Sequence, residues 1–255
     1  MTALITGASS GIGREIARRL GKMGVRLVIS GRNMERLEEL KKELGEKKVK
    51  IITADISKKD ECFRLYREAS EYGIDILVNN AGFGLYGEFL GTSLDRELEM
   101  LNVNIRAVHI LTKLFLRDFV KNNRGYILNV ASAAGFLPGP LMATYYSTKN
   151  YVVRLTEAIH EELRSSGSKV YIGAFCPGPV DTNFNKTAGV SFALKGISDD
   201  YAAACAVEGM FSRKALIIPT VKMKAGIIAS RFVPDTLLSM LTRHIQVTKR
   251  GAVRI

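Results

Sequence analysis

The stretch Thr6-Gly7-Ala8-Ser9-Ser10-Gly11-Ile12-Gly13 decides the fold of this 255-residue chain. It follows a short apolar run at residues 3–6 and precedes Ile16, Ala17 and Leu20, whose spacing begins a helical stripe. A strand, a glycine loop and a helix therefore follow one another. Glycines let the backbone turn tightly and approach a pyrophosphate, whose charge then lies at the positive end of the helix. The stretch predicts a dinucleotide-binding loop.

Further apolar runs rich in β-branched residues follow, separated by helix-sized segments. The seven predicted strands cover residues 3–6, 26–30, 49–54, 74–79, 126–131, 170–175 and 216–218. Strands that alternate with helices indicate right-handed βαβ crossovers and a parallel sheet covered on both faces. We predict an α/β fold with one doubly wound, seven-stranded parallel domain over residues 1–220. A short, basic and partly helical extension is expected over residues 221–255.

The segment after the second strand shows how a helix is recognised. Asn33 can cap its start and Gly45 can end it in a left-handed turn. The apolar side chains fall on one helical face, at Leu37, Leu40 and Leu44. Ser57 and Thr92 each stand three residues before an acid and are expected to cap two further helices.

The composition excludes several classes of protein. Apolar residues make up 47% and charged residues 24%, which is close to a globular average and unlike disordered, collagenous or disulfide-scaffold chains. Three cysteines, an odd number in a long chain, favour free thiols in a reducing compartment. The longest uncharged stretch, residues 125–148, contains Pro138 and Pro140, so we expect no transmembrane helix. With no signal peptide recognised at the start, a cytoplasmic location is expected.

The glycine loop has the spacing Gly-x-x-x-Gly-x-Gly, and it closely resembles the signature of the short-chain dehydrogenase/reductase family. The family's further motifs occur in the family's order, between residues 6 and 182. They are matched by Asn79-Asn80-Ala81-Gly82, by Asn104, by Ser132, by Tyr145 with Lys149, and by Pro177-Gly178-Pro179-Val180-Asp181-Thr182. The resemblance implies a Rossmann-type fold and a nicotinamide-dependent oxidoreductase.

Tyr145 and Lys149 would lie one helical turn apart on the same face. A phenol with a pKa near 10 is a poor proton donor or acceptor at neutral pH, and a neighbouring cation stabilises its phenolate. The resemblance implies that Tyr145 is the general acid in reduction and the base in oxidation. It implies that Lys149 also binds the nicotinamide ribose, that Ser132 orients the substrate oxygen and that Asn104 supports a water in the proton path. Tyr146 lacks a lysine four residues on.

NADP(H) is the predicted cofactor, with NAD(H) less favoured. The second strand ends in Gly31 and Arg32, where an NAD-preferring enzyme would place an acid, and Arg32 can offer a forked donor to a 2′-phosphate. Alternatively, Arg32 is an exposed residue at a helix start. The predicted cofactor-binding residues are Gly7, Ser9, Ser10, Gly11, Ile12, Gly13, Arg32, Asp55, Ile56, Asn80, Ala81, Gly82, Tyr145, Lys149, Pro177, Gly178, Val180 and Thr182.

The predicted substrate is an apolar ketone, aldehyde or secondary alcohol. The expected pocket walls are apolar: Phe83, Phe136, Leu137, Met142, Phe184 and Phe192. The same side chains could instead pack the loops together. A non-catalytic, dinucleotide-binding regulatory protein is the alternative function, but such a protein has no chemical need for all four of Asn104, Ser132, Tyr145 and Lys149. No histidine has a partner at ligand spacing, so no metal site is predicted.

The formal charge of +12 is concentrated at the C-terminal end, where residues 213–255 hold nine Lys or Arg against one acid, Asp235. Residues 234–245 predict a short helix with one apolar face, formed by Leu237, Leu238, Leu241 and Ile245. This helix could pack on the substrate loop or a second subunit, or lie weakly on an anionic membrane surface. A homodimer or homotetramer is implied by the resemblance, and no nucleic-acid partner is expected.

Overall fold

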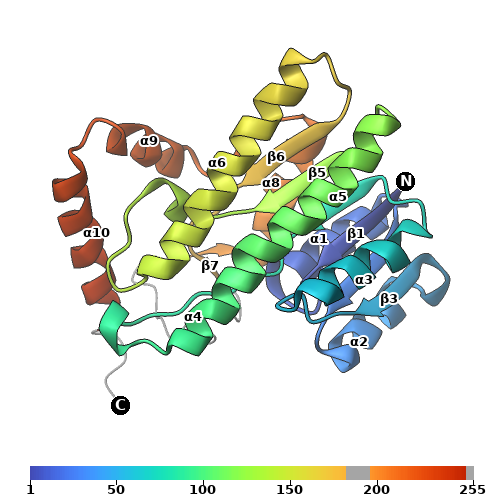
Figure 1. The fold of residues 1–255 in the computed structure, drawn as a ribbon, viewed down its shortest axis with the longest axis horizontal. Coiled ribbons are helices and arrows are strands. Elements are labelled where there is room, and N and C mark those ends of the chain that lie inside the picture. Colours follow the sequence, from blue (N-terminus) through green and yellow to red (C-terminus); the bar gives the residue numbers. More distant parts are fainter. Residues whose placement is uncertain (182–195, 251–255) are drawn as a thin grey trace.

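A seven-stranded parallel sheet forms the centre of the molecule in the computed structural model, which describes residues 1–181 and 196–250 (Figure 1). The strand order is β3-β2-β1-β4-β5-β6-β9. The strands are β1 (Thr2–Thr6), β2 (Arg26–Gly31), β3 (Val49–Thr53), β4 (Ile76–Asn79), β5 (Tyr126–Val130), β6 (Tyr171–Phe175) and β9 (Leu216–Ile217). The predicted fold class and all seven predicted strands are confirmed. Successive strands are added in one direction from β1 to β3 and in the other direction from β4 onward. Doubly wound sheets bind their ligands at such a reversal, which here lies between β1 and β4.

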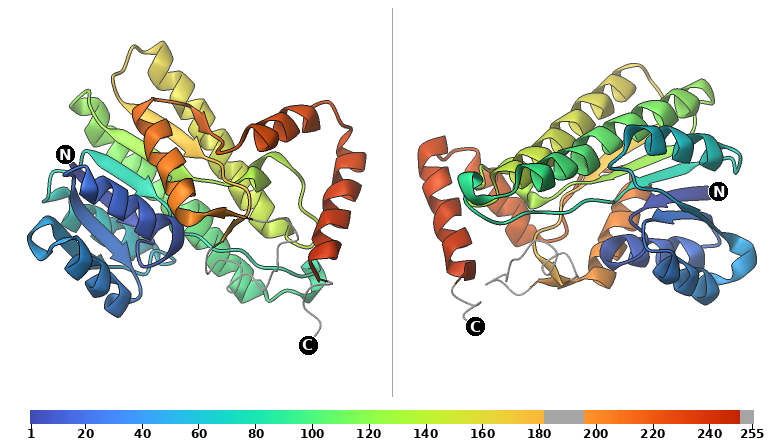
Figure 2. Two further views of the ribbon diagram at one scale, coloured as in Figure 1. Left: turned by 180° about the vertical axis from the view of Figure 1, so that it is seen from behind. Right: turned by 60° about the horizontal axis from the view of Figure 1, so that its bottom comes forward.

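Helices cover both faces of the sheet (Figure 2). One face carries α1 (Gly11–Lys22), α2 (Met34–Leu44) and α8 (Asp199–Phe211), and the other carries α3 (Lys59–Ser70), α4 (Leu94–Leu101), α5 (Val108–Lys121) and α6 (Ala143–Ser165). Strand side chains alternate between the two cores: Ala3 and Ile5 of β1 pack with α1 and α8, whereas Leu4 packs with α3 and α5. Because both faces are covered, β1 is buried at every residue.

The start of α2 is capped as the sequence predicts. The Asn33 side chain accepts a hydrogen bond of 2.9 Å from the Arg36 amide, and Gly45 follows the helix with a φ of 96°. The two other predicted caps are wrong by one residue. Ser57 donates to Asp55 in the preceding turn, and Ser93, rather than Thr92, caps α4. Both predicted residues are held by turns that close before the helices begin, Thr92 through the carbonyl of Phe89.

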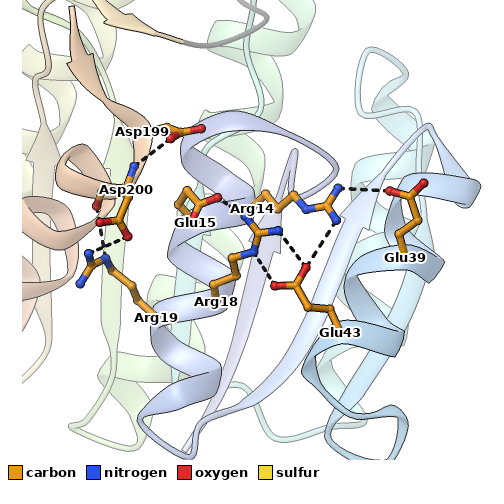
Figure 3. Close-up of polar contacts among 8 residues, drawn as sticks. All are labelled: Arg14, Glu15, Arg18, Arg19, Glu39, Glu43, Asp199 and Asp200. Carbon is orange, nitrogen blue, oxygen red and sulfur yellow. Dashed lines mark hydrogen bonds and ion pairs between the residues drawn. The ribbon is translucent and has the colours of Figure 1, made fainter.

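Ion pairs join α1 to its neighbours on the surface (Figure 3). The pairs to α2 and α8 are Arg14–Glu39, Arg14–Glu43, Arg18–Glu43 and Arg19–Asp200, and Arg18 also pairs with Glu15 within α1. The Arg18 guanidinium donates two hydrogen bonds, of 2.6 and 2.8 Å, to the Glu43 carboxylate. These hydrogen bonds lower the pKa of Glu43. These contacts hold α2 and α8 beside the helix that begins at the glycine loop.

The chain after β9 forms two helices, α9 (Val221–Ser230) and α10 (Asp235–Arg250). They lie at the end of the molecule opposite to α2 and β3 (Figures 1 and 2). The predicted C-terminal helix is therefore present and longer than expected, while α9 was not predicted. A short parallel pair, β7 (Val180–Asp181) with β8 (Ile197–Ser198), was also not predicted. Within the described residues, no helix combines the length and apolar character needed to span a membrane.

Candidate active site

The glycine loop is interlocked with the turn that follows β4. Asn80 donates through Nδ2 to the carbonyls of Thr6 and Gly7, at 3.0 and 3.1 Å. Gly7 has a φ of +66°, and a Cβ on Gly13 would lie 2.3 Å from Nδ2 of Asn80. Gly7 is therefore required by its backbone conformation, and Gly13 by the close approach of Asn80. The resemblance had assigned both the loop and the turn to the cofactor, and the fold places them side by side.

The glycine loop leads into the N-terminus of α1, which has no side-chain cap in the described part of the chain. Ser10 is the N-cap residue of α1, yet its side chain accepts no capping hydrogen bond from the described residues. The first amides of α1 are consequently available to an anion, as a pyrophosphate requires. Ser9 lies near the end of β2, since its Oγ is 3.6 Å from where a Cβ on Gly31 would stand. Ile12 is half-buried and packs on the α1 side of the core.

Asn104 lies in η3 (Asn102–Ala107), a π-helical turn between α4 and α5. Its amide holds the Phe83 backbone from both sides: Nδ2 donates to the Phe83 carbonyl at 2.9 Å, and Oδ1 accepts from the Phe83 amide at 3.1 Å. Nδ2 also lies 3.1 Å from Oγ1 of Thr148 on α6. Asn104 is 1% exposed. It therefore ties the turn after β4 to the helix that carries Tyr145.

Ser132, Tyr145 and Lys149 come together from two elements. Ser132 follows β5 and caps η4 (Ala133–Phe136), accepting from the Ala134 amide at 3.1 Å. Tyr145 and Lys149 lie on the first turns of α6 and are both buried. The Tyr145 hydroxyl hydrogen-bonds Ser132, and Nζ of Lys149 lies 5.9 Å from the centre of the Tyr145 ring. The sequence-predicted residues are thus neighbours in space.

Burial dominates the electrostatics of this group. It raises the pKa of Tyr145 well above its usual range, and the hydrogen bond with Ser132 opposes that rise. It lowers the pKa of Lys149 to about 8, because the ammonium loses its water while gaining few compensating contacts. Nζ of Lys149 donates to the Val130 carbonyl at 2.9 Å. The charge on Lys149 is therefore held in place, and water screens it poorly.

Gly82 lies in close contact with these residues. A Cβ at Gly82 would stand 3.0 Å from Oδ1 of Asn104 and 3.4 Å from Nζ of Lys149. A side chain at position 82 would therefore press on both groups, and glycine lets them approach the turn after β4 closely.

Arg32 extends from the end of β2 onto the surface, where its side chain is 64% exposed. Its Nη1 lies 3.0 Å from Oε1 of Glu99 on α4. This partner was not foreseen, because the two residues are 67 positions apart. Asp55 accepts from the amide and hydroxyl of Ser57, at 3.2 and 2.7 Å, and Ile56 is buried in the α3 core.

The predicted turn after β6 is only partly within the described residues. The Pro177 carbonyl accepts from the Ala133 amide at 2.8 Å, so the turn lies against η4. A Cβ on Gly178 would stand 2.2 Å from the end of Met223, which brings α9 onto the turn. Val180 is buried in β7. The predictions for Thr182, Phe184 and Phe192 lie outside the described residues.

The predicted substrate walls fall into two groups. Phe83 and Met142 are buried in the same apolar cluster as Tyr145. Phe136 packs in a different cluster and lies beside Arg154, with 5.9 Å between the guanidinium and the ring. The structure therefore does not group Phe136 with Phe83 and Met142. Leu137 is half-buried at the end of η4.

Sequence analysis missed a polar connection between α10 and this cluster. Nε2 of Gln246 donates to the Tyr146 hydroxyl at 2.5 Å, and the Tyr86 hydroxyl donates to the Gln246 carbonyl at 3.2 Å. The rings of Tyr145 and Tyr146 meet edge to face, 6.1 Å apart. Gln246 thus lies one side chain away from Tyr145. The only available signal was that Thr242 and Gln246 share a helical face.

In the described part of the chain, no three His, Cys, Asp or Glu side chains are placed to hold a metal ion. His109 contacts the Tyr151 hydroxyl at 2.7 Å, and His160 contacts the Ile172 carbonyl at the same distance.

Comparison with known proteins identifies relatives along most of the chain. A family profile described as short chain dehydrogenase matches residues 1–190. The very-long-chain 3-oxoacyl-CoA reductase of Anas platyrhynchos is 30% identical over 249 residues, which is 94% of this chain and 78% of that protein. A short-chain dehydrogenase from Sphingobium yanoikuyae, solved in complex with NADPH, has a TM-score of 0.83 at 30% identity and covers 90% of this chain and 92% of its own. A short chain dehydrogenase/reductase from Burkholderia phymatum, solved with NAD, has a TM-score of 0.81 at 26% identity, covering 89% and 91%.

The matched residues 1–190 include the glycine loop, six of the seven sheet strands and the group around Tyr145. The chain therefore belongs to the short-chain dehydrogenase/reductase family of Rossmann-fold oxidoreductases.

Proposed function

We propose that the protein is an NADP(H)-dependent oxidoreductase that acts on an apolar ketone, aldehyde or secondary alcohol, with Tyr145 as the general acid and base. The observation that carries this proposal is the meeting of Ser132, Tyr145 and Lys149, with a hydrogen bond between the first two. A protein that only binds a dinucleotide has no need to bury a lysine beside a tyrosine, because that arrangement is unfavourable for folding.

The residues around the glycine loop fit a nicotinamide dinucleotide. The uncapped amides of α1 suit its pyrophosphate, and the adenosine ribose would lie against Ser9 and Gly31 at the end of β2. When bound, the cofactor supplies hydride transfer to or from the substrate carbon. Asp55 and Ile56 would hold the adenine end. The turns at Asn80-Ala81-Gly82 and Pro177-Gly178 would hold the nicotinamide end, and Val180 and Thr182 are proposed as further ligands of the same end.

In the reduction direction, Tyr145 donates its hydroxyl proton to the substrate oxygen, which Ser132 orients by a second hydrogen bond. Lys149 stabilises the phenolate that remains. With a pKa of about 8, this lysine is about nine-tenths protonated at pH 7, so the required cation is present. Its charge acts strongly because the site is buried. In the oxidation direction, the same groups receive the proton.

Asn104 and Lys149 provide a route for the proton to reach Tyr145. A water held between Asn104 and Lys149 would complete this route, since both side chains lie against the backbone of Gly82. Asn104 therefore has two roles in the proposal. It fixes the Phe83 backbone, and it supports the water.

The apolar side chains packed around Tyr145 favour an apolar substrate. Phe83, Leu85, Tyr86, Met142 and Tyr146 belong to the same cluster as Tyr145. The related reductase from Anas platyrhynchos is named for a long acyl substrate, which agrees with this class. A panel of ketones, aldehydes, hydroxysteroids and acyl-chain carbonyl compounds, followed by the absorbance of reduced nicotinamide, identifies the active class.

The roles of the site residues are tested by Tyr145→Phe with Tyr146→Phe as the matched control. Tyr145→Phe should abolish turnover while nucleotide binding persists, because it removes the hydroxyl that carries the exchangeable proton and leaves the ring in place. Tyr146→Phe removes the same atom one residue away and should retain most of the activity.

Near-wild-type turnover by Tyr145→Phe would overturn the assignment. Nucleotide binding by the wild-type chain without turnover of any panel compound would instead support the regulatory, non-catalytic alternative.

Preference for NADPH rests on Arg32. No acid stands at the end of β2 to repel a 2′-phosphate, and the Arg32 guanidinium is exposed and within reach of ligands. In the structure, the Arg32 guanidinium forms an ion pair with Glu99. We therefore expect the phosphate to compete with Glu99 for Arg32.

Because of this competition, two substitutions should change the preference for NADPH in opposite directions. Arg32→Ala should reduce the ratio of kcat/KM for NADPH over NADH, whereas Glu99→Gln should increase it. Arg36→Ala changes an exposed arginine on the next helix turn and serves as the control. An unchanged ratio in Arg32→Ala excludes Arg32 as the phosphate ligand.

We also propose that the enzyme acts in the cytoplasm as a homodimer or homotetramer. Three free cysteines accord with a reducing compartment. Light scattering on the purified protein measures its oligomeric state.

A further inference from the structure

The amphipathic helix α10 turns its polar face inward. Thr242 and Gln246 are its most buried described side chains, at 5% and 1% exposure, and Gln246 is fixed by Tyr146 and Tyr86. The opposite face is apolar and open: Leu237, Met240, Leu241 and Ile245 are between 49% and 65% exposed. This is the reverse of a helix that packs on its own core.

Other exposed apolar side chains lie close to this face. The turn between α9 and α10 carries Phe232, which is 84% exposed, and α9 carries Val221 and Ile228. We define the C-terminal apolar surface as Phe232, Leu237, Met240, Leu241 and Ile245. A monomer rarely leaves so many large apolar side chains open on neighbouring elements.

Exposed cations lie on the same two helices and the turn between them. Lys222 and Lys224 on α9, Arg231 at its end and Arg243 on α10 are all exposed. No ion pair joins these four cations to any residue of 1–181 or 196–247. Residues 221–250 contain six Lys or Arg and one acid. A partner that is both apolar and negatively charged would be complementary to this surface.

A second copy of the chain is not complementary in this way, because a two-fold contact through α10 would bring two cationic surfaces together. A nucleic acid would neutralise the cations and leave the apolar side chains uncovered. An anionic lipid surface satisfies both demands.

We propose that α9 and α10 dock the protein on an anionic membrane surface. The C-terminal apolar surface enters the boundary between headgroups and acyl chains, and the four cations contact the headgroups. This docking does not depend on the reaction that the enzyme catalyses.

Vesicle sedimentation of the full chain tests the proposal. Neutral phosphatidylcholine vesicles are compared with vesicles that contain phosphatidylserine, at low and at moderate salt. The wild-type chain should sediment with the anionic vesicles at low salt and be released as the salt rises, because screening weakens the attraction.

Two double variants separate the charge from the apolar contribution. Lys222→Ala with Arg243→Ala should reduce the partition coefficient about thirtyfold. Lys47→Ala with Lys48→Ala is its control, since these exposed lysines lie in η1 (Glu46–Lys48) beside β3, at the opposite end of the molecule. Met240→Ser with Leu241→Ser should reduce it about tenfold. Met23→Ser with Val120→Ser, at similarly exposed positions, is the control.

Thermal unfolding by circular dichroism verifies that all four variants fold. A chain that stays in the supernatant with anionic vesicles at low salt overturns the proposal. Equal loss in a test variant and its control also overturns it, because the effect would then not depend on the position of the charges or of the apolar side chains. An oligomer that Met240→Ser with Leu241→Ser converts to monomers, without vesicle binding, assigns the surface to a second copy instead.

Discussion

Replacing Lys149 by methionine should stabilise the folded chain at pH 7, even though we propose that it removes catalysis. The folded protein keeps this side chain 6% exposed and lowers its pKa to about 8, from an ordinary value of 10.5. At pH 7 that difference corresponds to about 3 kcal/mol against folding. Methionine has a similar length and carries no charge. It leaves the Val130 carbonyl without its donor, which costs about 2 kcal/mol.

The sign of the pH dependence follows from the direction of the shift. A lysine whose folded-state pKa is depressed destabilises the fold most below that pKa, and the effect is relieved as the pH rises towards the unfolded value. At pH 10, the burial of Lys149 still destabilises the folded chain by about 1 kcal/mol. The lost hydrogen bond does not change with pH. Lys149→Met should therefore be about 1 kcal/mol more stable than the wild type at pH 7 and about 1 kcal/mol less stable at pH 10.

Urea unfolding without cofactor, followed by far-ultraviolet circular dichroism because the chain has no tryptophan, measures both values. Lys113→Met, at an exposed position on α5, is the control and should show no such reversal. A stability difference between Lys149→Met and wild type that is the same at pH 7 and pH 10 would refute the reasoning, because it would mean that the buried ammonium is adequately solvated.

Three other substitutions test the fold. Asn33→Ala should lower the free energy of unfolding by about 1 kcal/mol, because α2 loses its cap, and Asn33→Ser should restore it in urea titrations. Phe115→Ala should lower it by about 3 to 5 kcal/mol, since this ring is 1% exposed in the core between α5 and the sheet, and the thermal midpoint should fall accordingly. Glu43→Gln should lower it by less than about 1 kcal/mol at pH 7, because the ion pair with Arg18 is partly exposed. The pKa of Glu43 is depressed, so its contribution is present above the ordinary value of 4.5 and is lost as the pH falls below it. Acid titrations of Glu43→Gln and wild type should therefore converge at low pH.

The positions of the strands could be predicted because the local signals agree with the tertiary structure. The apolar runs are short, and β1, β2, β4, β5 and β6 are almost wholly buried, so continuous apolar segments mark them clearly. Asn33 acts through an amide three residues away, so its role was also visible in the sequence. The caps at Ser57 and Thr92 were placed one residue early, because a preceding turn uses the same hydroxyl groups and nothing local distinguishes the two.

The sequence by itself determined the doubly wound fold and the identity of the central group, because the glycine loop, Asn104, Ser132, Tyr145 and Lys149 appear in a fixed order with local spacing. Only the tertiary structure decided which residues, distant in sequence, contact Arg32 and the neighbour of Tyr145. Glu99 reaches Arg32 across 67 positions, and Gln246 reaches Tyr146 across 100. The apolar stripe of α10 could also be predicted from the sequence, but whether the stripe faces the protein or the solvent could not. Two polar contacts, with Tyr146 and Tyr86, cannot be recognised from the periodicity; they hold Gln246 inward and leave Leu237, Met240 and Leu241 facing outward.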